Sequence, residues 1–190
     1  MYVECWFGGT DGSPGTESTG TSFRFHTADT PTTADTSTPI PIPTADFNYS
    51  YWVHLCLTIS GSFTKVNNIR HYSDGTIGWN LGTSGELRRG NRDAGDKGCA
   101  KTDYDVATGT SGTTGHSIED DTNGHGYYDG QSTETADVAS DTSGSPATID
   151  SSDIETTADS KAIVLQVKVD TDATQGAQAA ETLTFKYDEI

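Results

Sequence analysis

The densest group of side chains that could bind a metal ion lies between His116 and Asp129. Within it, Asp121-Thr122-Asn123-Gly124-His125-Gly126 partly matches a calcium-binding loop, which needs oxygen ligands at alternating positions and a glycine at the sharp turn. The pattern suggests a calcium site, and apart from an ion in this segment we expect no cofactor. Its expected ligands are Glu119, Asp121, Asn123 and Asp129.

Two other interpretations of the same segment stay open. His125 stands where a third oxygen ligand belongs, and Ser132 stands where a bidentate acid belongs. The two histidines, His116 and His125, instead fit a transition metal. The segment also reads as an acidic, solvated turn with hairpin corners at Asn123-Gly124 and Asp129-Gly130.

Catalytic motifs are incomplete. Ser62-Phe63-Thr64-Lys65 has the Ser-x-x-Lys spacing of serine β-lactamases, which requires a helix start and partner motifs; here it follows an expected strand and has no partners. The chain has no Gly-x-Ser-x-Gly elbow, P-loop or Gly-x-Gly-x-x-Gly motif. Acid pairs such as Asp103 with Asp105, or Asp120 with Asp121, suggest a hydrolase, but adjacent acids on a strand point to opposite faces. We therefore predict no catalytic residues and no enzyme activity.

The chain has 190 residues, with 28 acidic and 11 basic side chains that give a net charge of −17. This charge repels phosphate backbones and anionic lipids, so neither nucleic acid nor a membrane is an expected partner. The Asp- and Thr-rich, Lys-poor composition resembles that of halophilic proteins, although any acidic surface protein can share it. One basic run, Arg88-Arg89-Gly90-Asn91-Arg92, is either a docking site for an acidic neighbouring subunit or a solvated loop.

Cys5, Cys56 and Cys99 show no metal-type spacing. One disulfide with a free thiol and three reduced, partly buried thiols are both compatible with the sequence. The first residues have no signal-peptide pattern, and no apolar run approaches the roughly 20 residues that span a bilayer. We expect the chain to be made as a soluble protein in the cytoplasm.

Alternating apolar residues predict β-strands. At the C-terminus two runs predict two strands of an antiparallel core, each with one buried and one solvent-facing side. The run from Phe47 to Ile59 predicts another strand, with Trp52, His54 and Cys56 facing away from its aliphatic side. The C-terminal runs comprise Ile163, Leu165, Val167 and Val169, alternating with Val164, Gln166 and Lys168, and then Leu183, Phe185 and Tyr187.

Further strands are expected at 63–72 and 76–81, separated by an Asp74-Gly75 turn. Pro39 to Pro43 should form an extended edge or a linker. Residues 82–160 carry thinly spread apolar residues and predict a long acidic, loop-rich insertion, made of projecting loops or of short strands. We therefore expect residues 1–190 to form one domain.

The stretch Asn67-Asn68-Ile69-Arg70-His71-Tyr72-Ser73-Asp74-Gly75 and the C-terminal strands resemble small β-sandwich virion structural proteins of tailed viruses. The resemblance covers about 47–81 and 161–190, and its motifs are strand patterns, not catalytic signatures. It implies a phage or haloarchaeal tailed virus as the source. The C-terminal segments that carry it are Ile163-Val164-Leu165-Gln166-Val167, Ala173-Thr174-Gln175-Gly176 and Leu183-Thr184-Phe185-Lys186-Tyr187-Asp188-Glu189.

The expected fold is all-β, an antiparallel β-sandwich of immunoglobulin-like or jelly-roll type with long polar loops. The expected function is that of a non-enzymatic virion structural protein, in capsid decoration or in the tail. Its expected partners are other copies of itself, as a homo-oligomer, and other virion proteins. The alternative is a carbohydrate-binding module in which Trp52, Trp79 or Tyr128 stacks on sugars.

Overall fold

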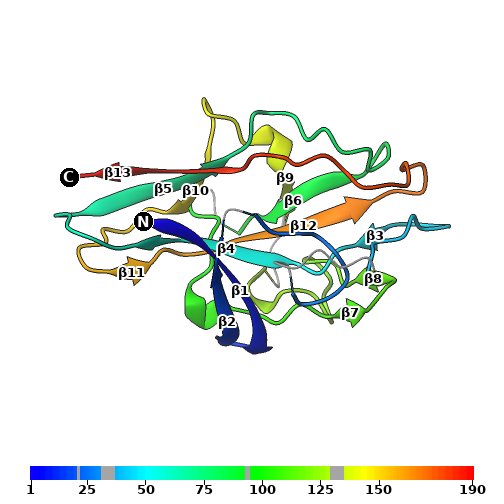
Figure 1. Ribbon diagram of the computed structural model, residues 1–190, viewed down its shortest axis with the longest axis horizontal. Helices are drawn as coiled ribbons and strands as arrows, with labels where there is room; N and C mark the ends of the chain where they lie inside the picture. Colours follow the sequence, from blue (N-terminus) through cyan, green and yellow to red (C-terminus); the bar gives the residue numbers. More distant parts are fainter. Residues whose placement is uncertain (21, 31–36, 93–94, 129–134) are drawn as a thin grey trace.

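The computed structural model describes residues 1–20, 22–30, 37–92, 95–128 and 135–190. It shows two antiparallel sheets packed against each other (Figure 1), so the prediction of an all-β antiparallel sandwich is confirmed. The helical residues in the described part of the chain form three short 3-10 helices, η1 (Lys101–Asp103), η2 (Gly126–Tyr128) and η3 (Val138–Ser140). None of these helices is long and apolar enough to cross a membrane.

The large sheet has the strand order β2-β1-β4-β12-β6-β9, with β11 paired to β4 and β3 paired to β12. The small sheet has the order β10-β5-β13, and β7 pairs with β8 in a separate hairpin. The strands of the large sheet are β1 (Tyr2–Thr10), β2 (Ser13–Thr19), β3 (Asn48–Tyr49), β4 (Val53–Ile59), β6 (Glu86–Gly90), β9 (Thr135–Asp137), β11 (Ala158–Asp159) and β12 (Ile163–Val169). The others are β5 (Val66–Tyr72), β10 (Ala147–Asp150), β13 (Thr184–Glu189), β7 (Gly109–Thr110) and β8 (Thr114–Gly115).

An aliphatic core fills the space between the two sheets, and we call it the intersheet core. Its centre is the antiparallel pair β4 and β12, in which Leu55 lies opposite Ile163 and Val53 lies opposite Leu165. Because side chains alternate along each strand, both strands turn their aliphatic sets to this side. The buried members include Val53, Leu55, Leu57, Ile59, Val66, Ile69, Leu87, Val138, Ile149, Ile163, Leu165 and Val167.

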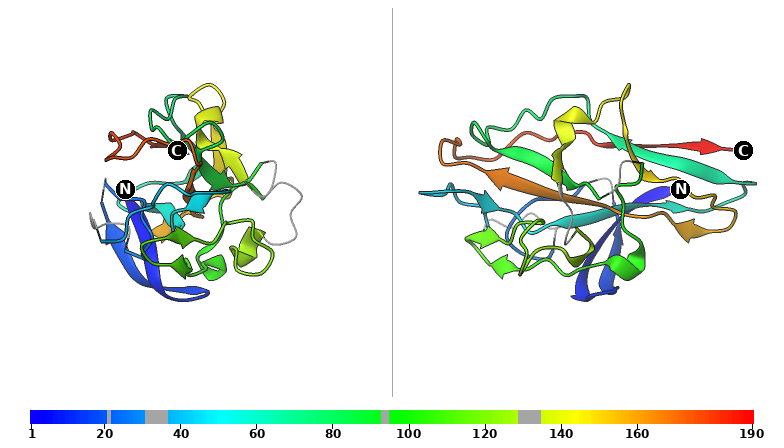
Figure 2. Two further views of the ribbon diagram at one scale, coloured as in Figure 1. Left: turned by 90° about the vertical axis from the view of Figure 1, so that its right-hand side faces the viewer. Right: turned by 180° about the vertical axis from the view of Figure 1, so that it is seen from behind.

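Both C-terminal strands form where the alternation predicts them, but they belong to different sheets. β12 lies in the large sheet between β4 and β6, whereas β13 pairs with β5 at the edge of the small sheet. Each is antiparallel to its neighbours, and they contribute to the intersheet core from opposite sides (Figure 2). Residues 170–183 connect the two sheets.

The opposite face of the large sheet is also buried, where the alternation predicts solvent. Val164, Gln166 and His54 are almost completely inaccessible there. They are covered by aromatic and aliphatic side chains from residues 98–128, which form a second layer that we call the outer core. Its buried members are Trp6, Trp52, Cys56, Cys99, Tyr104, Ala107, Ile118, Tyr128, Ala162 and Val164.

The expected strand at 47–59 is interrupted. β3 and β4 are separated by residues 50–52, where Tyr51 donates its backbone N–H to the carbonyl of His26 instead of to a neighbouring strand. Ser50 holds the interruption against β12, because its side-chain oxygen accepts the N–H of Val167 at 2.9 Å. No strand forms at 76–81, which is irregular.

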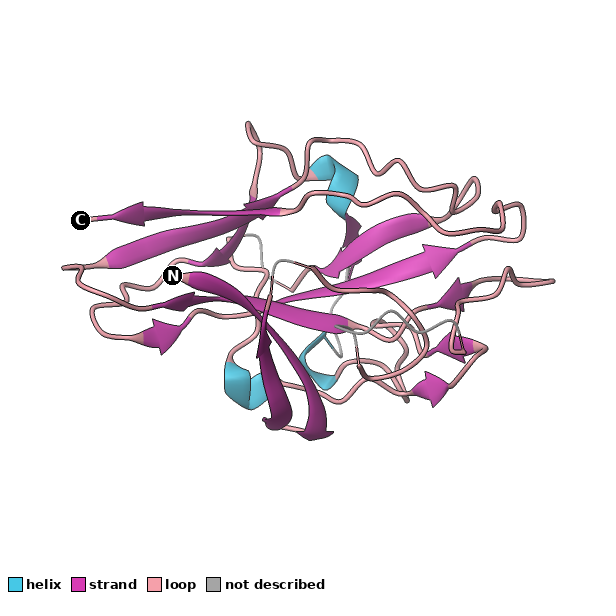
Figure 3. Cartoon of the chain, in the orientation of Figure 1, coloured by secondary structure: helices cyan, strands magenta, loops and turns pink. Residues whose placement is uncertain are grey.

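Residues 82–160 supply β6 and β9 to the large sheet and β10 to the small sheet. The weak sequence signal in this segment therefore corresponds to short strands as well as loops (Figure 3, strands in magenta). Pro39 to Pro43 forms neither helix nor strand; the side chain of Asn48 donates to the carbonyl of Pro41 at 2.9 Å, and Ile40 packs against the intersheet core. All three cysteines are buried and free, which excludes the disulfide interpretation for this structure.

Candidate functional site: a buried His-Cys-His cluster in the outer core

His54 is carried by β4 on the side opposite the aliphatic stripe, as the alternation predicts. The side chain is buried, not exposed, because the outer core covers it. Its ring lies 4.6 Å from the ring of Tyr104 and 5.0 Å from the ring of His125, measured between centroids. A polar ring thus sits in a mainly apolar, aromatic environment.

His125 comes from the loop that the sequence assigns to calcium. Its backbone N–H donates to the carbonyl of Ile118 at 3.0 Å, and its own carbonyl accepts the N–H of Tyr128 at 2.9 Å. Gly124 permits this tight path, because a Cβ there would lie 2.4 Å from the carbonyl oxygen of Asp120. These bonds fold the loop back on itself and direct the imidazole of His125 into the outer core, where it is buried.

The two imidazoles meet through their Nε2 atoms, which are 2.8 Å apart. Nδ1 of His125 accepts the backbone N–H of Tyr127 at 3.2 Å. The proton of His125 therefore resides on Nε2 and is donated to His54, whose own proton resides on Nδ1. Burial lowers the pKa of His54 well below its usual value and lowers the pKa of His125 to about 3, so both rings are neutral at pH 7.

Cys99 completes the cluster. Its backbone forms a two-way bridge with Ala162, just before β12, with both N–H···O distances at 2.8 Å. Its Sγ atom and one ring nitrogen of each histidine all lie within 4.8 Å of one another. Burial raises the pKa of this thiol, so it is protonated at neutral pH unless a cation replaces the proton.

Aromatic rings wall the cluster. Trp52 and Tyr128 lie 5.6 Å and 5.1 Å from the ring of His125, and Trp52 donates its Nε1–H to the carbonyl of Asp105 at 2.8 Å. Both rings are buried, so neither can stack on a sugar in this structure. Next to them, Asp105 accepts the N–H of Gly126 at 2.7 Å, and its pKa is raised to about 6, mainly by desolvation.

The predicted calcium ligands are not members of the His54, Cys99 and His125 cluster. Glu119 forms an ion pair with Arg88 at 3.1 Å and accepts a hydrogen bond from Thr135 at 3.0 Å. Asp121 and Asn123 are exposed, and Asp129 lies outside the described residues. The calcium site stays a prediction.

The adjacent Asp120 shapes the same loop from within. Its Oδ1 accepts the backbone N–H groups of Thr122 at 2.9 Å and Asn123 at 2.8 Å, which lowers the pKa of Asp120. His116, the other histidine considered as a metal ligand, contacts the hydroxyl of Thr108 through Nδ1 at 2.8 Å. It is not part of the clusters found among the described residues.

A second group of potential ligands, Glu4, Cys56 and Asp159, lies on β1, β4 and β11. Its carboxylates already have partners: Thr58 donates its hydroxyl to Asp159 at 2.8 Å and approaches Glu4 at 3.2 Å. Lys101 adds an ion pair with Asp159 at 3.5 Å. These contacts account for the group without a bound ion.

For the basic run at 88–92, the sequence suggests a docking site or a solvated loop. Its first two residues, Arg88 and Arg89, fit neither interpretation. Arg88 and Arg89 are buried in β6, on opposite faces of the large sheet. Arg89 forms a two-bond ion pair with Asp141 at 2.5 and 2.7 Å. Arg88 donates to Ser117 and to Gln166 at 2.6 Å each, in addition to its contact with Glu119.

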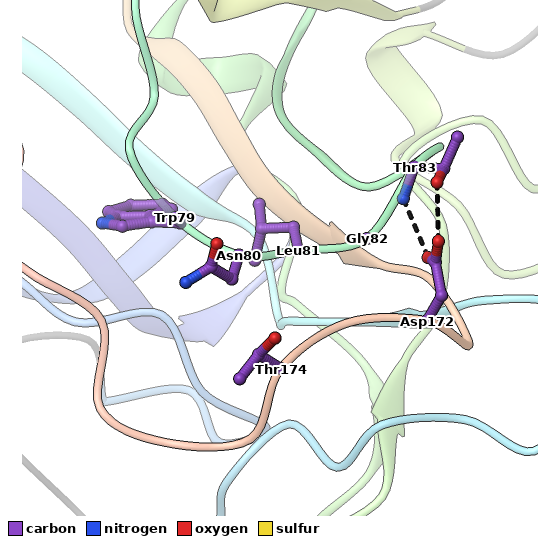
Figure 4. Close-up of a pocket in the computed structure, with 7 residues that line it drawn as sticks. All are labelled: Trp79, Asn80, Leu81, Gly82, Thr83, Asp172 and Thr174. Carbon is purple, nitrogen blue, oxygen red and sulfur yellow. Dashed lines mark hydrogen bonds between the residues drawn. The ribbon is translucent and has the colours of Figure 1, made fainter.

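One shallow, open hollow lies at the surface beside Trp79, with a volume of about 350 Å³ (Figure 4). Asp172 accepts hydrogen bonds from the backbone and hydroxyl of Thr83 at 2.8 and 2.6 Å at one end of it. Trp79 lies at the other end, half-buried against Phe25, and donates its Nε1–H to the carbonyl of Ala179. Of the three aromatic residues proposed to bind sugar, Trp79 alone lines this hollow.

The sequence offers no signal for the pairing of His54, Cys99 and His125. They lie 45 and 26 residues apart, on a strand, at a bridge and at a 3-10 turn, and no short spacing links them. Searches against family models, curated proteins and solved structures each found no match.

Proposed function

We propose that this protein is a non-enzymatic structural subunit, and specifically a virion protein of a tailed virus in capsid decoration or in the tail. The main support is that most basic side chains are paired with acids inside the fold, which leaves a strongly acidic surface. Within the part of the chain that the structure describes, seven basic side chains form ion pairs with acids of the same chain, so their charge is used inside the fold. They are Lys65, Arg70, Arg88, Arg89, Lys101, Lys161 and Lys168.

The outer surface is consequently dominated by acid, given the net charge of −17. A surface of this kind keeps particles soluble and apart, and it disfavours contact with nucleic acid or anionic lipid. It suits a protein that faces solvent on a particle. It also supports the proposed halophilic source, because high salt screens repulsion between such surfaces.

Assembly would use the sheet edges. β2 and β9 end the large sheet, and β10 and β13 end the small one. Edge strands are the parts of a sheet to which a neighbouring chain can add, although β10 already accepts the Lys97 N–H at the carbonyl of Thr148. Among the described residues, three large apolar side chains are exposed: Met1, Tyr2 on β1, and Ile190 just after β13, the last 69% accessible. Repeated contacts of this kind give avidity between copies without a large single interface.

The test is quantitative mass spectrometry of particles purified from the source. We expect this chain at a fixed, high copy number per particle, in a ratio to the major capsid protein that matches a symmetric position. Limited proteolysis adds a second measurement, in which cleavage at Pro39 to Pro43 should be slower in particles than in the isolated protein. Absence from particles, or equal cleavage rates in both states, would contradict the proposal.

A carbohydrate-binding module is the second candidate, and the hollow beside Trp79 is what favours it. Its polar lining, including Asn80 and Thr174, could hydrogen-bond sugar hydroxyls next to an aromatic ring (Figure 4). A glycan array with the wild type and with Trp79→Ala separates the two functions. Binding that is lost in the variant would favour the module, and no binding in either protein would remove it.

A further inference from the structure

We propose that His54, Cys99 and His125 bind one Zn²⁺ ion in the outer core. The proposal is independent of the structural role above, because the ligands lie inside the fold and not on an assembly surface. It rests on donor chemistry and on the convergence of three separate segments. Two imidazole nitrogens and one thiol sulfur form a donor set that suits a borderline-soft ion such as Zn²⁺.

The three donors are fixed before any ion arrives. His54 is held by β4 in the centre of the large sheet, and Cys99 is held by its bridge to Ala162. His125 is held by the backbone bonds of its loop to Ile118 and Tyr128. Because each donor belongs to a different packed element, binding would order little of the chain and would join the outer core to the sheet.

The spacing is close to what an ion requires. At Zn–N distances of about 2.0–2.1 Å and a tetrahedral angle, two nitrogen ligands lie about 3.3 Å apart. The Nε2 atoms of His54 and His125 are 2.8 Å apart, so the rings would need to separate by roughly half an ångström. The Cys99 sulfur lies within 4.8 Å of one ring nitrogen of each histidine and would move inward. Three protein ligands leave the fourth position for a water molecule.

Protons must move for the ion to enter. Cys99 loses its thiol proton to solvent and coordinates as thiolate, so one proton is released per Zn²⁺ bound. The proton on Nε2 of His125 is replaced by the metal and is carried on Nδ1 instead. That exchange breaks the 3.2 Å hydrogen bond from Tyr127, and this loss opposes binding.

The charge of the loaded site is also compensated. One Zn²⁺ and one thiolate leave a net charge of +1 in a largely apolar layer. Asp11 acts electrostatically on His125, and Asp105 accepts the N–H of Gly126, the residue after His125. These two carboxylates place negative charge at the rim of the site without being ligands.

The test begins with protein stripped of metal by a chelator and then titrated with ZnCl₂. We expect one equivalent to bind, and the melting temperature to rise by about 5–10 °C at a free zinc concentration one hundred times Kd. His125→Gln and Cys99→Ser should abolish the rise. The matched controls, His116→Gln and Cys5→Ala, remove a histidine and a buried thiol outside the cluster and should keep it. No rise in the wild type, or an equal rise in Cys99→Ser, would overturn the proposal.

Because the buried variants could fail to fold, a measurement on the wild type alone gives an independent answer. Co²⁺ substituted for Zn²⁺ should show thiolate-to-metal charge-transfer absorption and visible bands of a tetrahedral ion. X-ray absorption at the zinc edge should show one sulfur and two imidazole neighbours. A first shell of oxygen alone, or the absence of sulfur scattering, would mean that the two histidines form only a hydrogen-bonded pair.

Discussion

The two faces of the large sheet are buried in different ways. The intersheet core lies between two sets of strands, and its fully buried members are aliphatic except for Cys5. The outer core lies between strands and loops, and its buried members are mostly aromatic rings, thiols and small residues. In the first, many of the buried residues come from the alternating strands β4 and β12. In the second, one half comes from a segment whose apolar residues are scattered. A strand pattern therefore reports how a residue is directed, but not whether another part of the chain covers it.

The largest expected difference between the two faces concerns Arg88 and Arg89, which are consecutive in β6 and are buried on opposite faces of the large sheet. Asp141→Asn removes the charge that neutralises Arg89 on the intersheet side, where the acid is 5% accessible. We expect a loss of about 3–5 kcal/mol in the free energy of unfolding, because an unpaired buried charge remains. The measurement is urea unfolding monitored by circular dichroism.

Glu119→Gln is the matched change on the outer side. Glu119 is 45% accessible, and Arg88 would keep its bonds to Ser117 and Gln166. We expect a loss below about 1 kcal/mol. Equal losses of unfolding free energy in Asp141→Asn and Glu119→Gln would contradict this prediction, because the exposed ion pair would then contribute as much as the buried one.

The arginines also show why β6 escapes sequence-based prediction. Glu86-Leu87-Arg88-Arg89-Gly90 contains one aliphatic residue and reads as a solvated loop, yet it pairs with β12 and β9 in the large sheet. Its arginines are tolerated inside because each pairs with an acid more than 25 positions away along the chain, Glu119 for Arg88 and Asp141 for Arg89. Such partners are set by the tertiary fold, and no local pattern announces them.

The packing of the two faces can be compared on one strand. Leu165 points into the intersheet core and Val164 into the outer core, and both are completely buried. Leu165→Ala should cost about 2–5 kcal/mol through lost burial and a residual cavity. Val164→Ala should cost about 2 kcal/mol if the outer core is equally well packed. A loss under about 0.5 kcal/mol for Val164→Ala, measured by thermal and urea unfolding, would show that the loop layer is loosely packed.

His71 tests the intersheet core by pH. It is buried on β5, neither of its ring nitrogens has a hydrogen-bond partner among the described residues, and desolvation followed by the charge of Arg89 lowers its pKa to about 3. The unfolded chain binds this proton near pH 6.5 and the folded chain does not. Stability is therefore complete above pH 6.5 and falls as the pH drops towards 3, by up to about 1.4 kcal/mol per pH unit.

His71→Leu should reduce this acid loss by the share of one histidine, because leucine fills the site without a proton to bind. The buried His54 and His125, whose pKa values are also lowered, keep their shares. His116→Gln serves as the control, since that side chain lies outside the intersheet core and should leave the slope unchanged. The readout is the midpoint of urea unfolding at half-unit steps between pH 7 and pH 4. Parallel curves for wild type and His71→Leu would mean that another group dominates acid unfolding.

As with the fold, local sequence patterns predict one part of the candidate site, and the other part depends on tertiary packing. Alternation along residues 53–59 correctly directs His54 away from the aliphatic stripe, and the glycine and asparagine at 123–124 correctly predict a tight turn. The meeting of His54 with His125 and Cys99 could not be predicted, because it depends on how the loop layer folds onto the sheet. The sequence treated His125 as a loop residue that weakens a calcium site or pairs with His116 at a transition metal, whereas the structure buries it next to His54 and Cys99.

The smallest expected effect concerns the surface of that loop. If Glu119, Asp121 and Asn123 bind calcium, the ion should raise the melting temperature by mass action, by roughly 1 °C when its concentration equals Kd. The effect should be small because Arg88 already neutralises Glu119 and because Asp120, at the centre of the loop, is engaged by backbone N–H groups. Asp121→Asn should remove the shift, and magnesium chloride at equal ionic strength controls for screening. Calorimetry without heat at millimolar calcium, or the same shift in Asp121→Asn, would place the loop's role entirely in carrying His125 into the outer core.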